Sequence, residues 1–271
     1  MPVVWRHRPI IISSIVVLSL VSLDTRHAAW SRGYVRAAPK NVVSKCDRPK
    51  FKIILDVGHT AEAPGARSAR NIPEFDFNLR LAKRIEDRLK SEGFAQTSLL
   101  VTEGTARPSL FKRAAAINNS NADLVLSIHH DSVPDSFLEE WEFEGAKSRF
   151  SDRFSGYSLF VSRDNPKFWT SLRFARLLGH QMKAQGLQYA RQYAQAVMGR
   201  YRRKLLDKKV GIYRYDQLIV LARSRVPAVL FEAGSIINRD EELAMESTER
   251  QDMIGAAVVG AVKEFCASRW R

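Results

Sequence analysis

The chain has 271 residues, and its 45% hydrophobic content is enough for one sizeable core. It carries 43 Lys and Arg residues against 29 Asp and Glu residues, which gives a formal net charge of +14. Such a surface attracts polyanions, for example nucleic acid, anionic lipid headgroups or an acidic wall polymer. The length and hydrophobic content favour one catalytic domain, and two cysteines are too few for a structural zinc site made of cysteine ligands.

The N-terminus has the pattern of an export segment. Arg6 and Arg8 lie in a short basic region, and the run 9–23 after it is uncharged and mostly apolar. This run is shorter than the ~20 apolar residues that cross a bilayer comfortably. Residues 1–29 are therefore predicted to be a signal peptide, with an uncleaved anchor as the alternative, and the protein to be exported, either periplasmic or associated with the cell wall.

After a predicted linker at 30–49, the predicted catalytic domain at 50–271 alternates between apolar strands and amphipathic helices. Strands are predicted over 52–57, 97–102, 124–128, 157–161 and 226–231. Helices are predicted from Glu74 to a stop at Gly93 and over 109–118, 168–185 and 252–267. This alternation is typical of an α/β fold in which a mostly parallel, twisted sheet is covered by helices on both faces.

The two cysteines bracket the predicted domain. Cys46 precedes its first strand and Cys266 lies in its last helix. A disulfide between them in an oxidising compartment would close a long loop and contribute about a few kcal/mol. Two unrelated thiols are an equally good interpretation.

Polar side chains follow the predicted buried strands. His59, His129 and Glu232 each stand at the carboxyl end of a strand, where open α/β sheets bind ligands, and Glu74 opens the helix after the first strand. Each residue alone has an ordinary structural explanation, but together they share one edge of the sheet. Two imidazoles and one carboxylate, His59, His129 and Glu74, are a catalytic zinc set that leaves a fourth position open. Glu232 is then the candidate acid/base of a hydrolytic reaction.

The same residues lie in segments that resemble a known family. The segments are 54–59, Glu74 with Asn78 and Leu79, 122–129 and 226–232. In this order they resemble the blocks of the zinc-dependent N-acetylmuramoyl-L-alanine amidases, the type 3 peptidoglycan amidases, and the resemblance runs from about residue 50 to 265.

The resemblance implies cleavage of the amide between N-acetylmuramic acid and L-alanine in peptidoglycan. It implies one zinc ion per chain on His59, Glu74 and His129, with Glu232 as the catalytic glutamate. Arg113 and Asn238 also match the family pattern, and we treat them as candidate substrate contacts. The expected partner is peptidoglycan, with contact to an anionic wall or membrane surface, and the protein is expected to be a monomer.

Departures from the family pattern concern the neighbours of these residues. Thr60 follows the first histidine where glycine is usual, His130 and Asp131 follow the second, and Ser235 stands near Glu232. These changes bear on substrate preference more than on metal binding. Because adjacent strand residues point to opposite faces, His130 is expected to play a structural role or to support a ligand residue. Asp131 is a candidate for orienting a ligand imidazole.

Two charged segments have alternative interpretations. The acidic segment 134–153 could overhang the cleft and present a carboxylate to zinc, although a solvated surface loop is the commoner outcome. The basic segment 191–209 could grip glycan or anionic polymer, or form a solvated amphipathic helix. Residues 165–185 predict an ordinary core helix and not the inserted helix that plugs the zinc site in some family members.

Other functions remain to be weighed. A zinc peptidase that cuts within the stem peptide keeps the same fold and metal. A non-catalytic wall-binding protein would have no need of Glu232 as a general base. Nucleic-acid binding fits the charge, but the export segment and the absence of a recognisable nucleic-acid motif count against it, so no nucleic-acid partner is expected.

Overall fold

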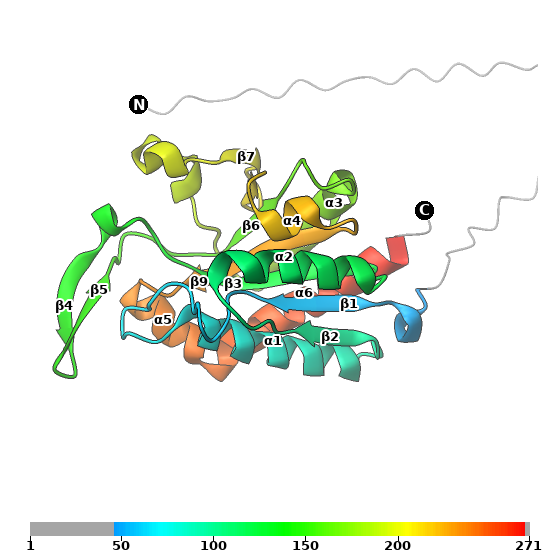
Figure 1. Ribbon diagram of the computed structural model, residues 1–271, viewed down its shortest axis with the longest axis horizontal. Coiled ribbons are helices and arrows are strands. Elements are labelled where there is room, and N and C mark those ends of the chain that lie inside the picture. The colour runs from blue at the N-terminus through cyan, green and yellow to red at the C-terminus, as the bar shows by residue number, and fades with distance from the viewer. Residues whose placement is uncertain (1–45, 269–271) are drawn as a thin grey trace, which may run out of the picture. The chain divides into compact units, whose positions relative to one another are not determined.

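A computed structural model describes residues 46–268 of the chain (Figure 1). The predicted signal segment and nearly all of the predicted linker lie outside these residues. The described residues belong to one compact unit. None of the helices in this part of the chain is both long and apolar enough to cross a membrane.

The domain is built on a seven-stranded sheet in the order β2-β1-β3-β9-β6-β8-β7. Its strands are β1 (Ile53–Val57), β2 (Thr97–Leu100), β3 (Leu124–Asp131), β6 (Ser158–Val161), β7 (Lys204–Asp207), β8 (Ile212–Arg214) and β9 (Ala228–Ser235). The four strands β2, β1, β3 and β9 are mutually parallel. β6 runs antiparallel to β9, β8 is parallel to β6, and β7 is antiparallel to β8. The predicted mostly parallel sheet is therefore confirmed.

Helices cover both faces of the sheet (Figure 1). They are α1 (Glu74–Ser91), α2 (Ala106–Asn119), α3 (Phe168–Ala184), α4 (Ile219–Arg223), α5 (Arg239–Glu246) and α6 (Thr248–Ser268). α1, α3 and α6 share the larger hydrophobic core, and α2 and α4 share the smaller one on the other face. Strands enclosed in this way are buried on both sides, which explains why β1 and the first half of β3 are mostly hydrophobic.

One buried polar group interrupts the centre of these strands. Arg113 of α2 donates to both carboxylate oxygens of Asp56 in β1, at 2.8 and 3.0 Å. Ser127 of β3 donates to the same carboxylate at 2.6 Å. Because the charges are paired and hydrogen-bonded, they can remain in the interior, and they fix α2 against the two central strands.

The acidic segment is a hairpin at the surface, so its predicted exposure to solvent is confirmed, whereas the prediction of an irregular loop is wrong. β4 (Glu139–Phe143) pairs antiparallel with β5 (Ala146–Phe150) as a separate two-stranded sheet that projects from the domain (Figure 1). Its turn consists of Glu144 and Gly145, both with positive φ, at 52° and 77°. A two-residue turn of this kind matches the twist of the flanking strands.

The basic segment is not an amphipathic helix, contrary to the solvated-helix interpretation. It consists of short 3₁₀ turns at Gln192–Ala194 and Ala196–Tyr201, followed by β7. Gly199 interrupts the second turn with φ of 50° and ψ of −121°, which no helix tolerates. The chain then continues as an edge strand beside β8.

The first and last parts of the described chain are covalently linked. Cys46 and Cys266 form a disulfide with a Cα–Cα distance of 5.3 Å. The bond ties the residues before β1 to the last turns of α6.

Candidate metal centre

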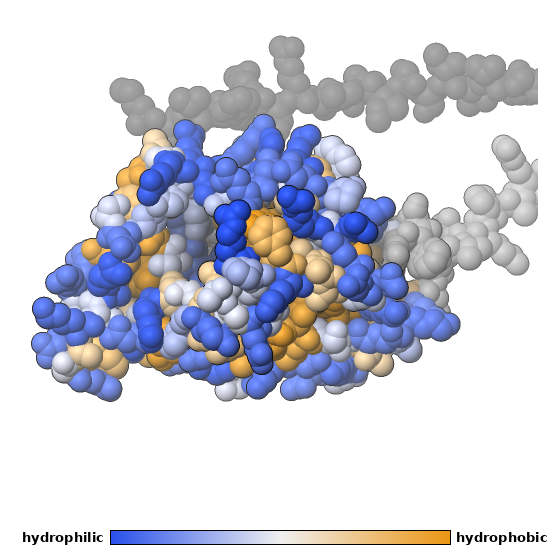
Figure 2. Space-filling model, in the orientation of Figure 1, coloured by the Kyte–Doolittle hydropathy of each residue, from blue (hydrophilic) through white to orange (hydrophobic). Residues whose placement is uncertain are grey.

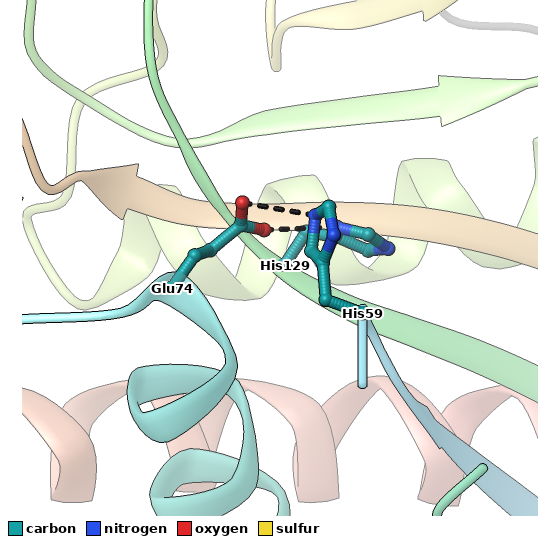
Figure 3. A group of neighbouring side chains, drawn as sticks. All are labelled: His59, Glu74 and His129. Carbon is teal, nitrogen blue, oxygen red and sulfur yellow. Dashed lines mark hydrogen bonds and ion pairs between the residues drawn. The ribbon is translucent and has the colours of Figure 1, made fainter. Parts of the chain in front are cut away.

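His59, Glu74 and His129 converge at the carboxyl end of the parallel strands (Figure 3). His59 follows β1, Glu74 is the first residue of α1, and His129 lies near the end of β3. Glu74 Oε2 lies 2.9 Å from His59 Nε2, and Glu74 Oε1 lies 3.0 Å from His129 Nδ1. One ligand atom from each residue lies within 4.8 Å of the other two, so one ion could contact all three.

The backbone around the group leaves room only for glycine at two positions. A Cβ on Gly58 would lie 2.5 Å from the His129 ring. A Cβ on Gly65 would lie 2.5 Å from Glu74 Oε2 and 2.7 Å from the His59 ring, and Gly65 also has φ of +81°. His59 itself has φ of 67°, an uncommon conformation for a residue with a side chain. The local chain is thus shaped to bring the imidazoles close to the carboxylate.

Glu74 is buried and hydrogen-bonded at both oxygens. Besides the imidazoles, Asn78 Nδ2 and the backbone N–H of Ala66 donate to it, each at 3.2 Å. Burial by itself would raise the pKa of Glu74, but the hydrogen bonds with His129 and His59 hold that pKa well below its usual range. Glu74 is therefore an anion over the whole physiological range, as a metal ligand must be.

The two neighbouring histidines of β3 have different roles. Burial lowers the pKa of His129, which favours the neutral imidazole that binds metals. His130 points to the α1 side, where its Nδ1 lies 2.8 Å from Asn78 Oδ1, and burial lowers its pKa to about 3. His130 is thus a structural residue on the opposite face, as the alternation of strand side chains predicts.

Glu232 lies beside the metal group without belonging to it. In the β3–β9 register it is the partner of His129. Its Oε2 is buried and has no hydrogen-bond partner among the described residues. Burial, followed by the negative charges of Asp131 and Glu74, raises the pKa of Glu232 well above its usual value. A carboxyl group in this environment is a strong base when ionised.

Asp131 does not contact an imidazole, contrary to the role we considered for it. A bulge separates it from His129, and its carboxylate accepts a hydrogen bond from Tyr193 Oη at 2.5 Å and a long one from Gln192 Nε2 at 3.5 Å. Burial is the main cause that raises the pKa of Asp131 to about 7. Its contacts attach the 3₁₀ turn at Gln192–Ala194 to the end of β3.

The side chains of the two candidate substrate contacts are engaged inside the protein. Arg113 is 1% exposed and bound to Asp56. Asn238 precedes α5, where its Oδ1 accepts from the backbone N–H groups of Asp240 and Glu241, and its Nδ2 donates to the Asp152 carbonyl. An N-cap of this kind satisfies the first turn of the helix and leaves little of the amide for a ligand.

Some residues near the centre were given no role in the site from the sequence. Asn78 contacts Glu74, His130 and the Gly58 carbonyl. Its contact with Glu74 could have been predicted, because residues four positions apart in a helix are neighbours. Tyr193 and Gly65 reach the centre only through tertiary structure, so no local pattern marks them.

The remaining segments near the centre supply no further ligand. Within residues 46–268, His59, Glu74 and His129 are the only group of His, Cys, Asp and Glu side chains close enough to hold a metal ion, so no hairpin glutamate joins them. α3 packs in the larger core, where Phe174 and Leu178 are fully buried, as predicted for an ordinary core helix.

The fold and these side chains define an α/β domain with a metal-competent site at the carboxyl edge of its parallel strands. The family model of N-acetylmuramoyl-L-alanine amidase matches residues 53–264. The chain belongs to this family, as its sequence blocks predicted.

Individual relatives are distant in sequence. The chain is 23% identical to the N-acetylmuramoyl-L-alanine amidase Rv3717 of Mycobacterium tuberculosis, over 77% of this chain and 75% of that protein. It is 22% identical to the amidase AmiC of Escherichia coli, over 82% of this chain and 54% of that protein. Among solved structures, the amidase Ami1 of Mycobacterium smegmatis has a TM-score of 0.61 at 20% identity, over 81% of this chain and 98% of that one. An amidase from Clostridium difficile 630 has a TM-score of 0.59 at 21% identity, over the same shares. These structures confirm the fold.

Proposed function

We propose that the protein is a zinc-dependent hydrolase of the amide between N-acetylmuramic acid and L-alanine in peptidoglycan, and that it remodels the cell wall. Its family membership supports the reaction. The observation that carries the proposal is the juxtaposition of a three-residue metal group with Glu232, whose buried Oε2 has no hydrogen-bond partner among residues 46–268.

The side chains fit one zinc ion per chain. His59, Glu74 and His129 provide two nitrogen donors and one oxygen donor, the set that catalytic zinc sites use, with a further coordination position left for substrate. Bound zinc would supply Lewis acidity that polarises the scissile carbonyl. Asn78 and the Ala66 N–H hold the Glu74 carboxylate in place for this role.

Glu232 performs the proton transfers. It takes a proton from the attacking water and delivers it to the leaving nitrogen of L-alanine, which departs as an amine. Its burial and the nearby negative charges raise its pKa, so the ionised group is more basic than an exposed glutamate. It remains free for this work because it is not one of the three residues that would hold the ion.

The setting of the reaction follows from features outside the centre. An export segment in residues 1–29 would deliver a monomeric enzyme to the periplasm or cell wall, and the Cys46–Cys266 disulfide suits an oxidising compartment. The +14 formal charge favours contact with wall polymers or membrane surfaces that carry negative charge.

Product analysis tests the proposal. Purified protein is incubated with purified peptidoglycan, with and without a chelator, and the products are identified by mass spectrometry. We expect peptides with a free L-alanine amine and glycan with free lactyl carboxylates, loss of both with chelator, and recovery with zinc. A cut inside the stem peptide would favour the peptidase alternative. Binding without any cleavage would favour a wall-binding protein.

A further inference from the structure

A pocket of about 590 Å³ lies at the amino end of the parallel strands, and this volume is within the ~300–1,000 Å³ typical of ligand pockets. Asp123 and Pro227, which directly precede β3 and β9, line it together with the start of α3 and the end of α6. The metal centre is at the other end of these strands. With a rise of ~3.3 Å per residue, β3 covers roughly 17 Å between Leu124 and His129. The end of α6 and the β4–β5 hairpin accordingly lie at opposite ends of the domain (Figure 1). The pocket is therefore separate from the metal centre, and no step of the proposed reaction uses it.

One wall of the pocket is an exposed tryptophan. Trp169 is 70% exposed, the largest value among the exposed large hydrophobic side chains of residues 46–268. Its ring packs edge-on against the buried Phe168 ring, with centroids 5.0 Å apart, and the Arg163 guanidinium lies 5.7 Å from its centroid. Leaving so large an apolar ring in water is unfavourable. A ligand with a flat apolar surface, such as the C–H face of a sugar ring, would cover it.

The remaining charge of the pocket is mainly positive. Lys167, Arg173 and Arg225 line it, and none of the three forms an ion pair within residues 46–268. Lys167 and Arg225 are exposed, whereas Arg173 uses Nη1 to donate to the Ser268 carbonyl at 3.0 Å. Asp123 is the one carboxylate in the lining, and it accepts a backbone N–H at 2.9 Å. Two exposed cations thus stand beside the aromatic wall and favour an anionic ligand.

The surroundings do not suit insertion into a lipid surface. Helices that lie in a membrane interface bury a row of apolar side chains. Trp169 is the only exposed large hydrophobic residue that lines this pocket in the described chain. The face shown in Figure 2 is also mainly hydrophilic, and polar residues separate its apolar areas. An aromatic ring among cations instead matches a polymer that combines sugar rings with negative charges.

We propose that this pocket binds the peptide-free glycan strand of the wall, with a sugar ring on Trp169 and a lactyl carboxylate at Lys167 and Arg225. The identity of the polymer rests on the proposed function. Hydrolysis of the amide adds water across the bond, so the peptide leaves with an amine and the glycan keeps a carboxylate. Each cut therefore adds one negative charge to the strand. A strand held in the pocket keeps the enzyme near the amides that remain on the same polymer.

Titration with two glycans tests the charge requirement. One probe is a peptide-free glycan strand, which carries lactyl carboxylates and no scissile amide. The other is a chito-oligosaccharide of equal length, which has N-acetylglucosamine rings without lactyl groups. We expect the full-length protein to bind the glycan strand more tightly in calorimetry. Equal affinity for the two probes, or no binding of the strand, would overturn the proposal.

Matched variants test the residues. Because buried aromatic contacts dominate many interfaces, we expect Trp169→Ala to raise the Kd for the strand at least about tenfold. Exposed charge pairs are weaker, so Lys167→Ala and Arg225→Ala should each raise it about two- to fivefold. The controls are Phe111→Ala, an exposed aromatic residue elsewhere, and Lys183→Ala, an exposed cation on α3; neither residue lines the pocket. Both controls should bind as the wild type does. An unchanged Kd in Trp169→Ala would refute the assignment, as would binding to phosphatidylglycerol vesicles that Trp169→Ala abolishes while the strand does not bind.

Cleavage of a small substrate separates this pocket from the metal centre. N-acetylmuramoyl-L-alanine has the scissile amide but no glycan strand, so Trp169→Ala should cleave it with the kcat/KM of the wild type. A large loss on this substrate would place Trp169 in the catalytic machinery and overturn the proposal. If the wild-type protein does not cleave it, the proposed function fails. Strand binding that Trp169→Ala weakens and Phe111→Ala leaves intact would then still support the pocket.

Discussion

Glu74 and Glu232 stand at the same edge of the sheet but in opposite surroundings. Glu74 has an imidazole at each oxygen, and its pKa is held low in spite of burial. Glu232 has a buried oxygen with no hydrogen-bond partner in the described chain, and its pKa is raised by burial and by neighbouring anions. Two identical side chains therefore differ in basicity because their neighbours differ.

The difference separates a ligand from a proton carrier. A carboxylate with a low pKa remains charged and suits a cation, whereas one with a raised pKa accepts and returns a proton near neutral pH. The protein thus needs no unusual residue to obtain both functions, only a different number of hydrogen-bond donors around each glutamate.

The largest expected effect comes from removing the proton carrier. Glu232→Gln keeps the shape of the side chain but cannot accept a proton, so we expect amide cleavage to fall about 10²- to 10⁴-fold. Zinc content, measured by mass spectrometry of the metal, should stay near one per chain. The matched variant Glu74→Gln should lose the zinc as well. If Glu232→Gln also lost its metal, the two glutamates would not have separate roles.

Asp56 extends the comparison to a carboxylate that is fully paired and has no access to solvent. Arg113→Ala leaves this charge buried without its cation, so we expect the free energy of unfolding to fall by about 3–5 kcal/mol. Denaturant titration followed by circular dichroism measures the change. An unaltered stability with a raised KM would instead restore Arg113 as a substrate contact.

Asn78 tests how the ligand glutamate is held. Asn78→Ala removes the donor to Glu74 Oε1 and the contact with His130, so we expect zinc affinity to fall about 10- to 100-fold. Activity should recover at saturating zinc, which a competition titration with a chromogenic chelator can verify. Activity that stays low with zinc fully bound would show that Asn78 acts beyond the ligand.

The smallest expected effect concerns the anion next to the proton carrier. Asp131→Asn removes a negative charge that raises the pKa of Glu232, while its amide oxygen still accepts from Tyr193. The pKa of Glu232 should fall, so its ionised form persists to lower pH. We expect the acid limb of the pH–activity profile to move down by about one pH unit. An unmoved limb would mean that Asp131 only anchors the turn that contains Tyr193.

The parallel half of the sheet was predictable because its strands are buried on both faces. Continuous apolar runs such as 124–128 ended at chemically distinctive residues, and parallel topology collects strand ends at one edge. The same logic predicts from the sequence alone that His59, His129 and Glu232 are neighbours. Glu74 was predicted to join them because it starts the helix that follows the first strand.

The rest of the sheet and its surroundings lacked such signals. β8 has three residues and β7 begins with an exposed lysine, so neither reads as a buried run. Charged residues obscured the hairpin, although Glu144-Gly145 between short alternating segments was a usable turn signal. Tyr193 meets Asp131 from 62 residues away along the chain, a distance that no local pattern spans.

The Cys46–Cys266 bond gives the domain the topology of a closed ring, since 220 positions of sequence separate the two sulfur-bearing residues. A single proteolytic nick anywhere between them leaves both fragments in one covalent molecule. The fragments separate on a denaturing gel only after reduction. Cleavage at an exposed point such as the hairpin turn would thus open the ring without releasing either end.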